Sequence, residues 1–461
     1  MNAHYDLIIL GAGSGNSVLS DAFDGKRVAI VEPDAFGGTC LNRGCIPTKM
    51  LVHAADLAYT AAGSERFGVD LSLNGVDWPA IRERVFDRID PIAERGKEYR
   101  KGLENVDVYE GTASFLGERR VEIELNDGTI EISGDQIVIA VGARPHLPQL
   151  PGLETVPFHT SDTIMRVDEL PKRVGIIGGG YIASEMAHVL GALGCAETVF
   201  VRGDRFLKHE DDDIAHAFTT AMQDRFACIM NARLTAVAKR GDAIVVTHDV
   251  SGVPNDIVVD ALLVATGRVP NADQINAAAG GIELTPDGRV LVDQYGRTSA
   301  TGVWALGDVC SPFQLKHVAN HEARVIANNI TQPGDEARWQ VIAKDPVPHA
   351  VFAHPQIASA GMTESEARAA GLDIEVARRD YADSAWGWAL EDTTSFVKLI
   401  MDSASRTLLG GHIIGPHAAS LIQPIIQMMR FKQTVDEVAT QPYYIHPAPS
   451  EVIEQALLEL C

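Results

Sequence analysis

The chain has 461 residues, 46% of them hydrophobic, and 41 glycines and 22 prolines, so we expect two to four domains of a loop-rich α/β enzyme. Its formal net charge of −23 argues against general binding to nucleic acids or anionic membranes, both of which need clustered Lys and Arg. No apolar run approaches the roughly 20 residues that span a bilayer, and no export signal is visible. Six cysteines are too few for a disulfide framework, so we expect the protein to work in a reducing cytoplasm.

The first predicted elements form a strand–turn–helix–strand unit. An apolar strand over residues 5–10 precedes the glycine loop Gly11-Ala12-Gly13-Ser14-Gly15-Asn16, and we expect a helix to about Asp24 and a strand from Arg27 to Val31. The strand ends at Glu32, 21 residues after the first glycine, where a dinucleotide ribose contact requires an acid. A tight turn without a ligand is the alternative. Asn16 stands where Gly or Ala is usual, which predicts looser or differently oriented helix–strand packing.

A closely spaced cysteine pair follows in the stretch Gly-Gly-Thr-Cys-Leu-Asn-Arg-Gly-Cys-Ile-Pro-Thr-Lys, residues 37–49. Beside a dinucleotide loop, Cys40 and Cys45 predict a redox pair that cycles between dithiol and disulfide. A structural disulfide is one alternative, and half of a zinc site is another, although no second Cys pair or suitably spaced His pair exists. Cys45 lies closer to the next helix start, which would lower the pKa of its thiol. Lys49 needs a carboxylate partner if it is buried; the alternative is a solvated lysine at a helix end.

A second glycine unit begins at residue 173 with an apolar strand and the loop Gly178-Gly179-Gly180-Tyr181-Ile182-Ala183. Gly178, Gly180 and Ala183 fill its small-residue positions, and we expect a helix to about Leu193. The next strand, residues 198–201, ends without an acid and is followed by Arg202, Arg205 and Lys208. Two units of different character predict two different nucleotides.

The segments between and after the two glycine units predict how the domains are connected. Short alternating segments surround a hairpin signal at residues 126–128, and two similar buried strands, 137–141 and 262–266, mark where the chain leaves and re-enters the first domain. A third such strand carries Asp308 at its tip. From about Asp345 onwards, alternating strands and amphipathic helices are expected to form a separate domain. We therefore expect an α/β protein with a first nucleotide domain (1–147 and 267–344), a second (148–266) and a C-terminal α+β domain (345–461).

Together and in this order, these motifs resemble the two-dinucleotide flavoprotein disulfide reductases, the family of the glutathione, trypanothione, lipoamide and mercuric reductases. The resemblance covers essentially the whole chain. It implies two Rossmann-like domains, FAD in the first and a nicotinamide nucleotide in the second, and a homodimer formed through the C-terminal interface domain. The cofactor-binding residues that it implies are Gly11, Gly13, Ser14, Gly15, Glu32, Thr39, Lys49, Ala113, Asp308, Gly178, Gly180, Tyr181, Ile182, Arg202, Lys208 and Gly267.

The same resemblance implies the catalytic roles. Cys45 would face the flavin and Cys40 would attack the substrate disulfide. Lys49 would pair with Glu185 on the second nucleotide helix and favour hydride acceptance by the flavin. His446 and Glu451 would form a proton-shuttling dyad that serves the other subunit's cysteines. The remaining cysteines, Cys195, Cys228, Cys310 and Cys461, are expected to be structural or exposed thiols.

The nucleotide is expected to be NADPH. An acid at the end of the second unit's strand would accept from a free ribose hydroxyl and repel a 2′-phosphate, whereas this chain has Val201 there and Arg202 next. Arg202 should matter more than Lys208, because a guanidinium binds phosphate in a bidentate manner. A solvated basic turn is the alternative.

The expected substrate is a low-molecular-weight disulfide. Segments 86–93, 161–166 and 315–324 look like those of the family members that reduce the disulfide of mycothiol, a cysteinyl pseudodisaccharide. Asp21 aligns with an arginine of glutathione-reducing members and would repel the carboxylates of glutathione, whereas Arg324 aligns with another such arginine and is retained. Tyr99 is a further candidate contact.

Three rival functions remain. Lipoamide dehydrogenase normally has an acid at the Val201 position, and mercuric reductase has paired C-terminal thiols where this chain has the single Cys461. A flavoprotein scaffold without activity is disfavoured, because both redox cysteines, Lys49 and the predicted dyad are present.

Overall fold

The computed structural model describes residues 3–250, 252–332, 334–343 and 345–461; the predicted boundaries at residues 1 and 344 lie outside these ranges. A seven-stranded sheet with the order β3-β2-β1-β6-β5-β4, and with β16 beside the end of β6, forms the first unit. Its strands are β1 (Ala3–Leu10), β2 (Val28–Val31), β3 (Val106–Tyr109), β4 (Gly111–Gly117), β5 (Arg120–Leu125), β6 (Gly128–Ile139) and β16 (Val303–Ala305). Its helices are α1 (Gly38–Arg43), α2 (Cys45–Ala62), α3 (Trp78–Lys101) and α6 (Lys316–Ile330).

Strands β3, β2, β1, β6 and β16 are parallel to one another: β3 pairs with β2, β2 with β1, and β1 with β6, and β16 pairs with the end of β6. Residues 7–10 and 28–31 are buried along their whole length, because apolar side chains face cores on both sides of the sheet. β5 and β6 form the predicted hairpin, with Leu125 opposite Gly128. Every parallel strand therefore ends at the edge where the glycine loop lies.

The helix predicted after the first glycine loop is not formed, and this part of the prediction is wrong. Two short 3₁₀ helices, Ser14–Ser17 and Asp21–Phe23, occupy its place. The Asn16 side chain donates its amide N–H to the Ala12 carbonyl at 2.9 Å, so it competes with helical hydrogen bonding as Asn and Ser side chains commonly do. The sequence predicted a different helix–strand packing at Asn16, whereas the structure replaces the α-helix itself with two 3₁₀ helices.

The second unit is a parallel sheet with the order β10-β9-β8-β14, flanked by an antiparallel sheet β11-β12-β13. Its elements are β8 (Arg173–Ile177), α4 (Tyr181–Ala192), β9 (Ala196–Phe200), α5 (Asp212–Arg225), β10 (Ala227–Ile229), β11 (Arg233–Arg240), β12 (Ala243–Val250), β13 (Val253–Val259) and β14 (Ala261–Val264). The chain enters and leaves this unit through a two-stranded antiparallel ribbon, β7 (Ala143–Pro145) and β15 (Arg268–Pro270). The residues that directly follow the two similar strands, 143–145 and 268–270, therefore pair with each other.

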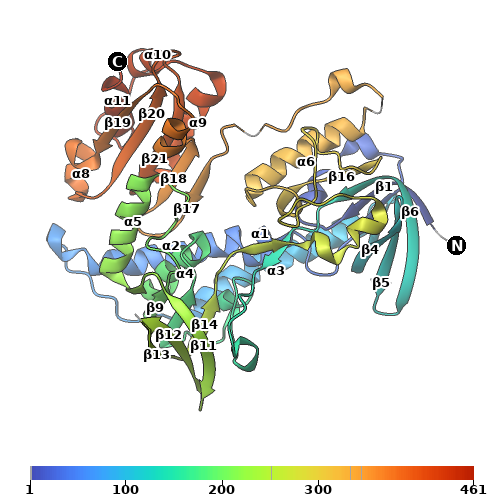
Figure 1. The fold of residues 1–461 in the computed structure, drawn as a ribbon, viewed down its shortest axis with the longest axis horizontal. Helices are drawn as coiled ribbons and strands as arrows, with labels where there is room; N and C mark the ends of the chain where they lie inside the picture. Colours follow the sequence, from blue (N-terminus) through green and yellow to red (C-terminus); the bar gives the residue numbers. More distant parts are fainter. Residues whose placement is uncertain (1–2, 251, 333, 344) are drawn as a thin grey trace.

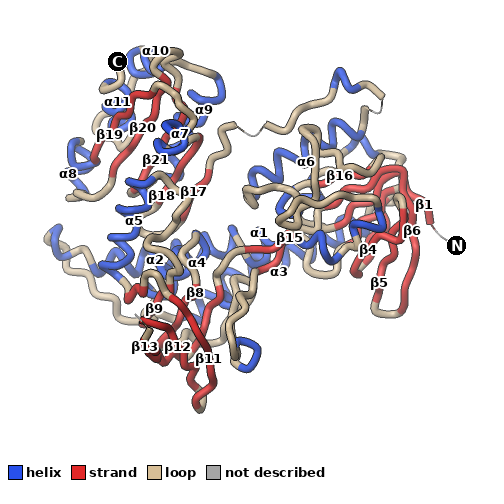
Figure 2. The backbone as a smooth tube through the Cα atoms, viewed as in Figure 1, coloured by secondary structure: helices blue, strands red, loops and turns tan. Residues whose placement is uncertain are grey.

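The C-terminal unit is a five-stranded antiparallel sheet with the order β17-β18-β21-β20-β19 and helices packed on it (Figures 1 and 2). Its strands are β17 (His349–Val351), β18 (Ile357–Gly361), β19 (Ile374–Asp380), β20 (Phe396–Asp402) and β21 (Leu408–Ile414). Its helices are α7 (Glu364–Ala369), α8 (Ala385–Leu390), α9 (Ala418–Phe431), α10 (Val435–Thr440) and α11 (Glu451–Leu458). The predicted class, two Rossmann-like units followed by an α+β unit, is confirmed. In the described ranges no helix has both the length and the apolar character needed to cross a membrane.

Candidate active site

The first glycine loop is shaped for a close backbone approach. Gly11 has φ +102°, and a Cβ on it would lie 2.4 Å from the Ala140 carbonyl oxygen, so only glycine fits there. Glu32 closes the loop from the tip of β2, since its Oε2 accepts a 2.7 Å hydrogen bond from the Ala12 N–H. Burial raises the pKa of Glu32. A narrow loop with a carboxylate beside it suits a dinucleotide's pyrophosphate and ribose.

Lys316, Asp308 and Arg268 form a group of charged side chains, of which Lys316 contacts Ser14 in this loop. The Lys316 ammonium, at the start of α6, donates to Ser14 Oγ at 2.8 Å. Asp308 follows β16, and its Oδ2 lies 3.8 Å from the Nε of Arg268, whose side chain is only 6% exposed. Arg268 also donates to Thr39 Oγ1 at 3.5 Å, and its buried Nε has no hydrogen-bond partner among the described residues. This orphaned donor and the half-buried Asp308 are polar groups that an FAD molecule could satisfy.

The redox cysteines are free thiols that lie on consecutive helices, with Cys40 in α1 and Cys45 at the first position of α2. A hydrogen bond between the two sulfurs couples them: it lowers the pKa of Cys40 and raises the pKa of Cys45. The helix start does lower the pKa of Cys45, as the sequence predicted, but this effect is outweighed by the shared hydrogen bond. The lowered pKa expected for the Cys45 thiol is therefore not found.

Lys49 is exposed, and the expected direct ion pair with Glu185 is not formed in the described part of the chain. Its ammonium lies 4.3 Å from the centre of the Phe352 ring, and the Phe352 N–H donates to Glu185 Oε1 at 2.9 Å. A solvated lysine over an aromatic face needs no carboxylate partner, which explains the difference. Burial raises the pKa of Glu185 to about 7, and the nearby Lys49 partly opposes this rise.

The second glycine loop leaves space where a phosphate would approach. Gly180 lies in open space, and Gly179 packs against the buried Val201 side chain at the end of the next strand. Arg202 and Lys208 are exposed and form no ion pair within the described ranges. Arg205, by contrast, is paired with Asp212 at 2.6 Å. The three basic residues noted in the sequence thus divide into two that are available to an anion and one that is not.

The predicted C-terminal dyad is formed. His446 Nδ1 and Glu451 Oε1 lie 2.6 Å apart, with the His446 side chain 70% exposed and Glu451 nearly buried at 12%. A carboxylate on one ring nitrogen orients the imidazole and leaves Nε2 free to exchange a proton with solvent or with a bound molecule.

The other predicted residues are distributed as follows. Ala113 is buried in β4, Ile182 is partly buried at the start of α4, and Gly267 is exposed with φ +115°. Tyr181, at the first position of α4, is 42% exposed. The substrate candidates Asp21, Tyr99 and Arg324 are all exposed, while Cys195 and Cys310 are buried and Cys461 is exposed.

Sequence reasoning missed Lys316, Arg268 and a partly buried pair between α2 and α4, His188 and Asp56. In that pair His188 Nε2 lies 2.8 Å from Asp56 Oδ1, and Arg225 contacts the other ring nitrogen at 3.1 Å. Lys316 was part of a segment used for the family resemblance, but its neighbour Ser14 is 302 residues away. No local pattern could have indicated these contacts.

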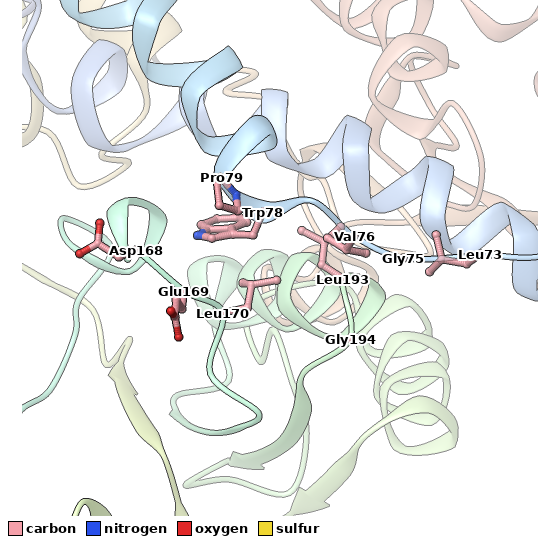
Figure 3. A pocket seen from close by; sticks show the side chains of 10 residues that line it. All are labelled: Leu73, Gly75, Val76, Trp78, Pro79, Asp168, Glu169, Leu170, Leu193 and Gly194. Carbon is pink, nitrogen blue, oxygen red and sulfur yellow. The ribbon is translucent and has the colours of Figure 1, made fainter.

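A pocket of about 490 Å³ lies outside this site (Figure 3). Apolar side chains around the start of α3 and just after the end of α4 line it, including Val76, Trp78 and Leu193, and Asp168 and Glu169 also line it. Leu193 lies beyond the C-terminal end of α4, whereas Tyr181 and Glu185 lie at its start. None of the predicted site residues lines this pocket.

Fold and site together define a redox enzyme of a known family. Residues 5–323 match the pyridine nucleotide-disulphide oxidoreductases, and residues 347–457 match the dimerisation domain of that family. The chain belongs to this family and is an FAD-dependent oxidoreductase that uses a pyridine nucleotide.

Among individual relatives, the chain is 47% identical over 460 residues to mycothione reductase of Mycobacterium tuberculosis, with 99% of both chains covered. It is 30% identical to mercuric reductase of Lysinibacillus sphaericus, covering 94% of this chain and 79% of that protein. A solved structure, the Cu(II) complex of the HOCl-induced flavoprotein disulfide reductase RclA from Escherichia coli, superposes with a TM-score of 0.87 at 28% identity over the whole of both chains.

Proposed function

We propose that this enzyme uses NADPH to reduce the disulfide of mycothiol to two mycothiol molecules. The observation that carries the proposal is the pair of free thiols, Cys40 and Cys45, on the consecutive helices α1 and α2 beside the first glycine loop, in a chain 47% identical to a mycothione reductase. Residues 1–147 and 267–344 would hold FAD, residues 148–266 NADPH, and residues 345–461 the subunit interface. Sparse cysteine use agrees with a reducing cytoplasm as the compartment.

The reaction divides into two thiol–disulfide exchanges. The Cys40 thiolate attacks one substrate sulfur, the substrate S–S bond breaks, and the first thiolate leaves with the electron pair and takes a proton from His446. Cys45 then gives its proton to the neutral His446 and attacks the Cys40 sulfur; the mixed disulfide breaks, and the second thiolate leaves with the electron pair and takes that proton from His446, which leaves a Cys40–Cys45 disulfide. Bound FAD supplies the two-electron relay from the nicotinamide that restores the dithiol. In total, one disulfide, one NADPH and one proton give two thiols and NADP⁺.

His446 would act on the cysteines of a second copy of the chain. Figure 1 shows α11, which begins at Glu451, in the C-terminal unit and well separated from α1. A dyad so far from its own cysteines can serve catalysis only across an interface, and residues 347–457 match a dimerisation domain. A homodimer with two shared sites follows, and a monomer should be inactive.

NADPH is preferred over NADH in this proposal because of the turn after β9. Val201 ends the strand without a carboxylate, and Arg202 and Lys208 are exposed and unpaired within the described ranges. A 2′-phosphate would meet two available cations and no repelling acid.

Mycothiol disulfide is preferred over glutathione disulfide because of Asp21. This exposed carboxylate can accept hydrogen bonds from sugar and inositol hydroxyls, whereas it would repel the carboxylates of glutathione. Arg324, also exposed, would favour an anionic substrate and weakens the discrimination. Tyr99, 64% exposed, is a candidate surface for the sugar rings.

A side-by-side turnover assay tests the proposal. The purified holoenzyme is given NADPH or NADH with the disulfides of mycothiol, glutathione and lipoamide, and kcat/KM is measured for each combination. We expect the highest value for NADPH with mycothiol disulfide. Comparable values for glutathione and mycothiol disulfides would contradict the substrate assignment. Faster turnover of NAD⁺ with dihydrolipoamide would favour lipoamide dehydrogenase instead.

A further inference from the structure

A buried lysine ties the start of α5, in the second nucleotide unit, to the C-terminal unit. Lys398 lies in β20 and its side chain is 3% exposed. Its ammonium donates to Asp211 at 2.8 Å and to Asp213 at 2.6 Å, both at the start of α5, and it lies 2.7 Å from Glu364 of its own unit. Asp211, 1% exposed, also accepts from the Glu364 N–H at 3.0 Å. Separation of the two units would leave buried charges without partners, so these contacts hold the start of α5 in place.

The residue before Asp211 makes a second link to the C-terminal unit. Glu210 Oε1 lies 2.5 Å from Nε2 of His349 in β17, and Glu210 Oε2 accepts from Ser359 Oγ in β18 at 2.6 Å. The Glu210 side chain is nearly buried, and Ser359 is buried. Figure 1 shows α5 extending from the second unit toward β17 and β18. Two consecutive residues, 210 and 211, are therefore anchored on the C-terminal unit.

These anchored residues end the turn that carries Lys208. The Leu207 N–H donates to the Gly179 carbonyl at 2.8 Å, so the turn contacts the second glycine loop, and the Glu210 N–H donates to the Leu207 carbonyl at 2.8 Å. Leu207 has φ +48°, a left-handed conformation that a leucine keeps only where its surroundings fix the backbone. Lys208 thus lies between a contact with the glycine loop and residues held by the C-terminal unit.

Arg202, the other available cation of this turn, is held without the C-terminal unit. The carbonyl of its neighbour Gly203 accepts from the Asn231 N–H at 2.8 Å, and Asn231 follows β10 of the same nucleotide unit. The two cations are therefore positioned by different contacts, and only Lys208 is two residues from the anchored Glu210.

We propose that Lys398 is a positioning residue of the nucleotide site, which holds residues 207–211 so that Lys208 meets the 2′-phosphate of NADPH. This inference rests on the proposed function, in which NADPH is the reductant. A turn that leaves this position for part of the time binds the phosphate more weakly in proportion. The C-terminal unit then supports nucleotide recognition in addition to the subunit interface.

Binding of adenosine 2′,5′-bisphosphate and of adenosine 5′-monophosphate to the oxidised holoenzyme tests the inference without turnover. The two probes differ only in the 2′-phosphate, and calorimetry gives both Kd values. Lys398→Met should weaken binding of the bisphosphate by roughly three-fold more than binding of the monophosphate, the scale of one exposed charge contact. In a Lys208→Ala background Lys398→Met should add no selective loss, whereas in an Arg202→Ala background the loss should persist.

Hydrogen exchange of residues 207–210 without nucleotide measures the anchoring directly. It should be faster in Lys398→Met than in the wild type. Arg406→Met is the matched control, because Arg406 pairs with Asp436 at 2.5 Å inside the C-terminal unit, and it should change neither exchange nor the Kd values. If Lys398→Met does not give folded holoenzyme, Ser359→Ala, which removes one hydrogen bond to Glu210, must produce the same changes at smaller size.

Unchanged exchange in these variants, or a selective loss that persists in the Lys208→Ala background, would overturn the inference. A wild type that prefers the bisphosphate, with the same preference in Lys398→Met, would overturn the inference alone and leave the proposed function standing. Equal wild-type Kd values for the two probes would be a failure of the proposed function, because NADPH would not be recognised by its 2′-phosphate, and the inference would fail with it.

Discussion

Glu197→Gln should stabilise the enzyme at neutral pH and have little effect in mild acid. Glu197 lies in β9, 8% exposed, and neither carboxylate oxygen has a hydrogen-bond partner within the described ranges. Burial raises the pKa of Glu197 well above its ordinary value, while the Arg225 guanidinium opposes the rise. The side chain is wedged beside Gly191, where an added Cβ would lie 2.5 Å from Oε2.

The size of the effect follows from proton linkage. In the unfolded chain this carboxyl titrates near pH 4.3, so folding at pH 7 must add a proton to it or bury its charge. Keeping the folded carboxyl protonated lowers the free energy of unfolding by about 1.4 kcal/mol for each pH unit above 4.3. The destabilisation by Glu197 at pH 7 is therefore at most roughly 3–4 kcal/mol. A group whose folded pKa is raised has its full stability below its unfolded pKa and loses stability as the pH rises toward the folded value. Because Arg225 attracts the charged form of Glu197, we expect Glu197→Gln to raise the free energy of unfolding at pH 7 by less than this bound, on the order of 2–3 kcal/mol.

Thermal midpoints of the holoenzyme at pH 5.5, 6.5 and 7.5 measure this gain. For a chain of 461 residues that unfolds as one unit, a gain of this size should raise the midpoint by roughly 2–3 °C at pH 7.5, and the difference should shrink with each step toward acid. Glu104→Gln, on an exposed residue without an ion pair in the described ranges, is the control and should change nothing. Equal midpoints for wild type and Glu197→Gln at pH 7.5, or a difference independent of pH, would refute the reasoning.

Three predictions concern catalysis. Cys40→Ser should retain flavin reduction by NADPH and gain thiolate–flavin absorbance from Cys45, because loss of the Cys40 sulfur frees Cys45 from the shared proton. Normal disulfide turnover in this variant would contradict the assignment of Cys40 as the residue that attacks the substrate. His446→Ala should slow turnover by roughly 10²–10⁴-fold with flavin reduction intact, as stopped-flow and steady-state rates will show. Arg202→Ala should lower kcat/KM for NADPH by roughly ten-fold or more and leave NADH unaffected, with a smaller effect for Lys208→Ala; equal use of both nucleotides by the wild type would count against this.

Elements that depend on local pattern were predictable. The apolar runs at 5–10 and 173–177 form the expected strands, the two glycine loops follow them, and His446 contacts Glu451 only five residues away. In each case the residues that make the structure are neighbours in the chain, so their spacing carries the information.

Features that depend on distant contacts were not predictable. The Phe352 ring lies against the Lys49 ammonium and the Phe352 N–H donates to Glu185, and these contacts replace the expected ion pair. The missing helix after the first glycine loop is a different kind of failure, because the glycine signature indicated a helix while the Asn16 side chain favoured a turn.

The ribbon of β7 and β15 has a consequence for how this chain folds. β16 must pair with the end of β6, although residues 140–302 separate them. Closing a flexible loop of about 160 residues costs on the order of 4–5 kcal/mol of chain entropy. Pro145 and Arg268 are paired, so the segment between them begins and ends at one place. Once this segment has folded, the flexible loop between β6 and β16 is shortened to about 40 residues. This shortening lowers the closure cost by about 1 kcal/mol, so folding of the inserted segment before the first sheet is complete favours the pairing of β16 with β6.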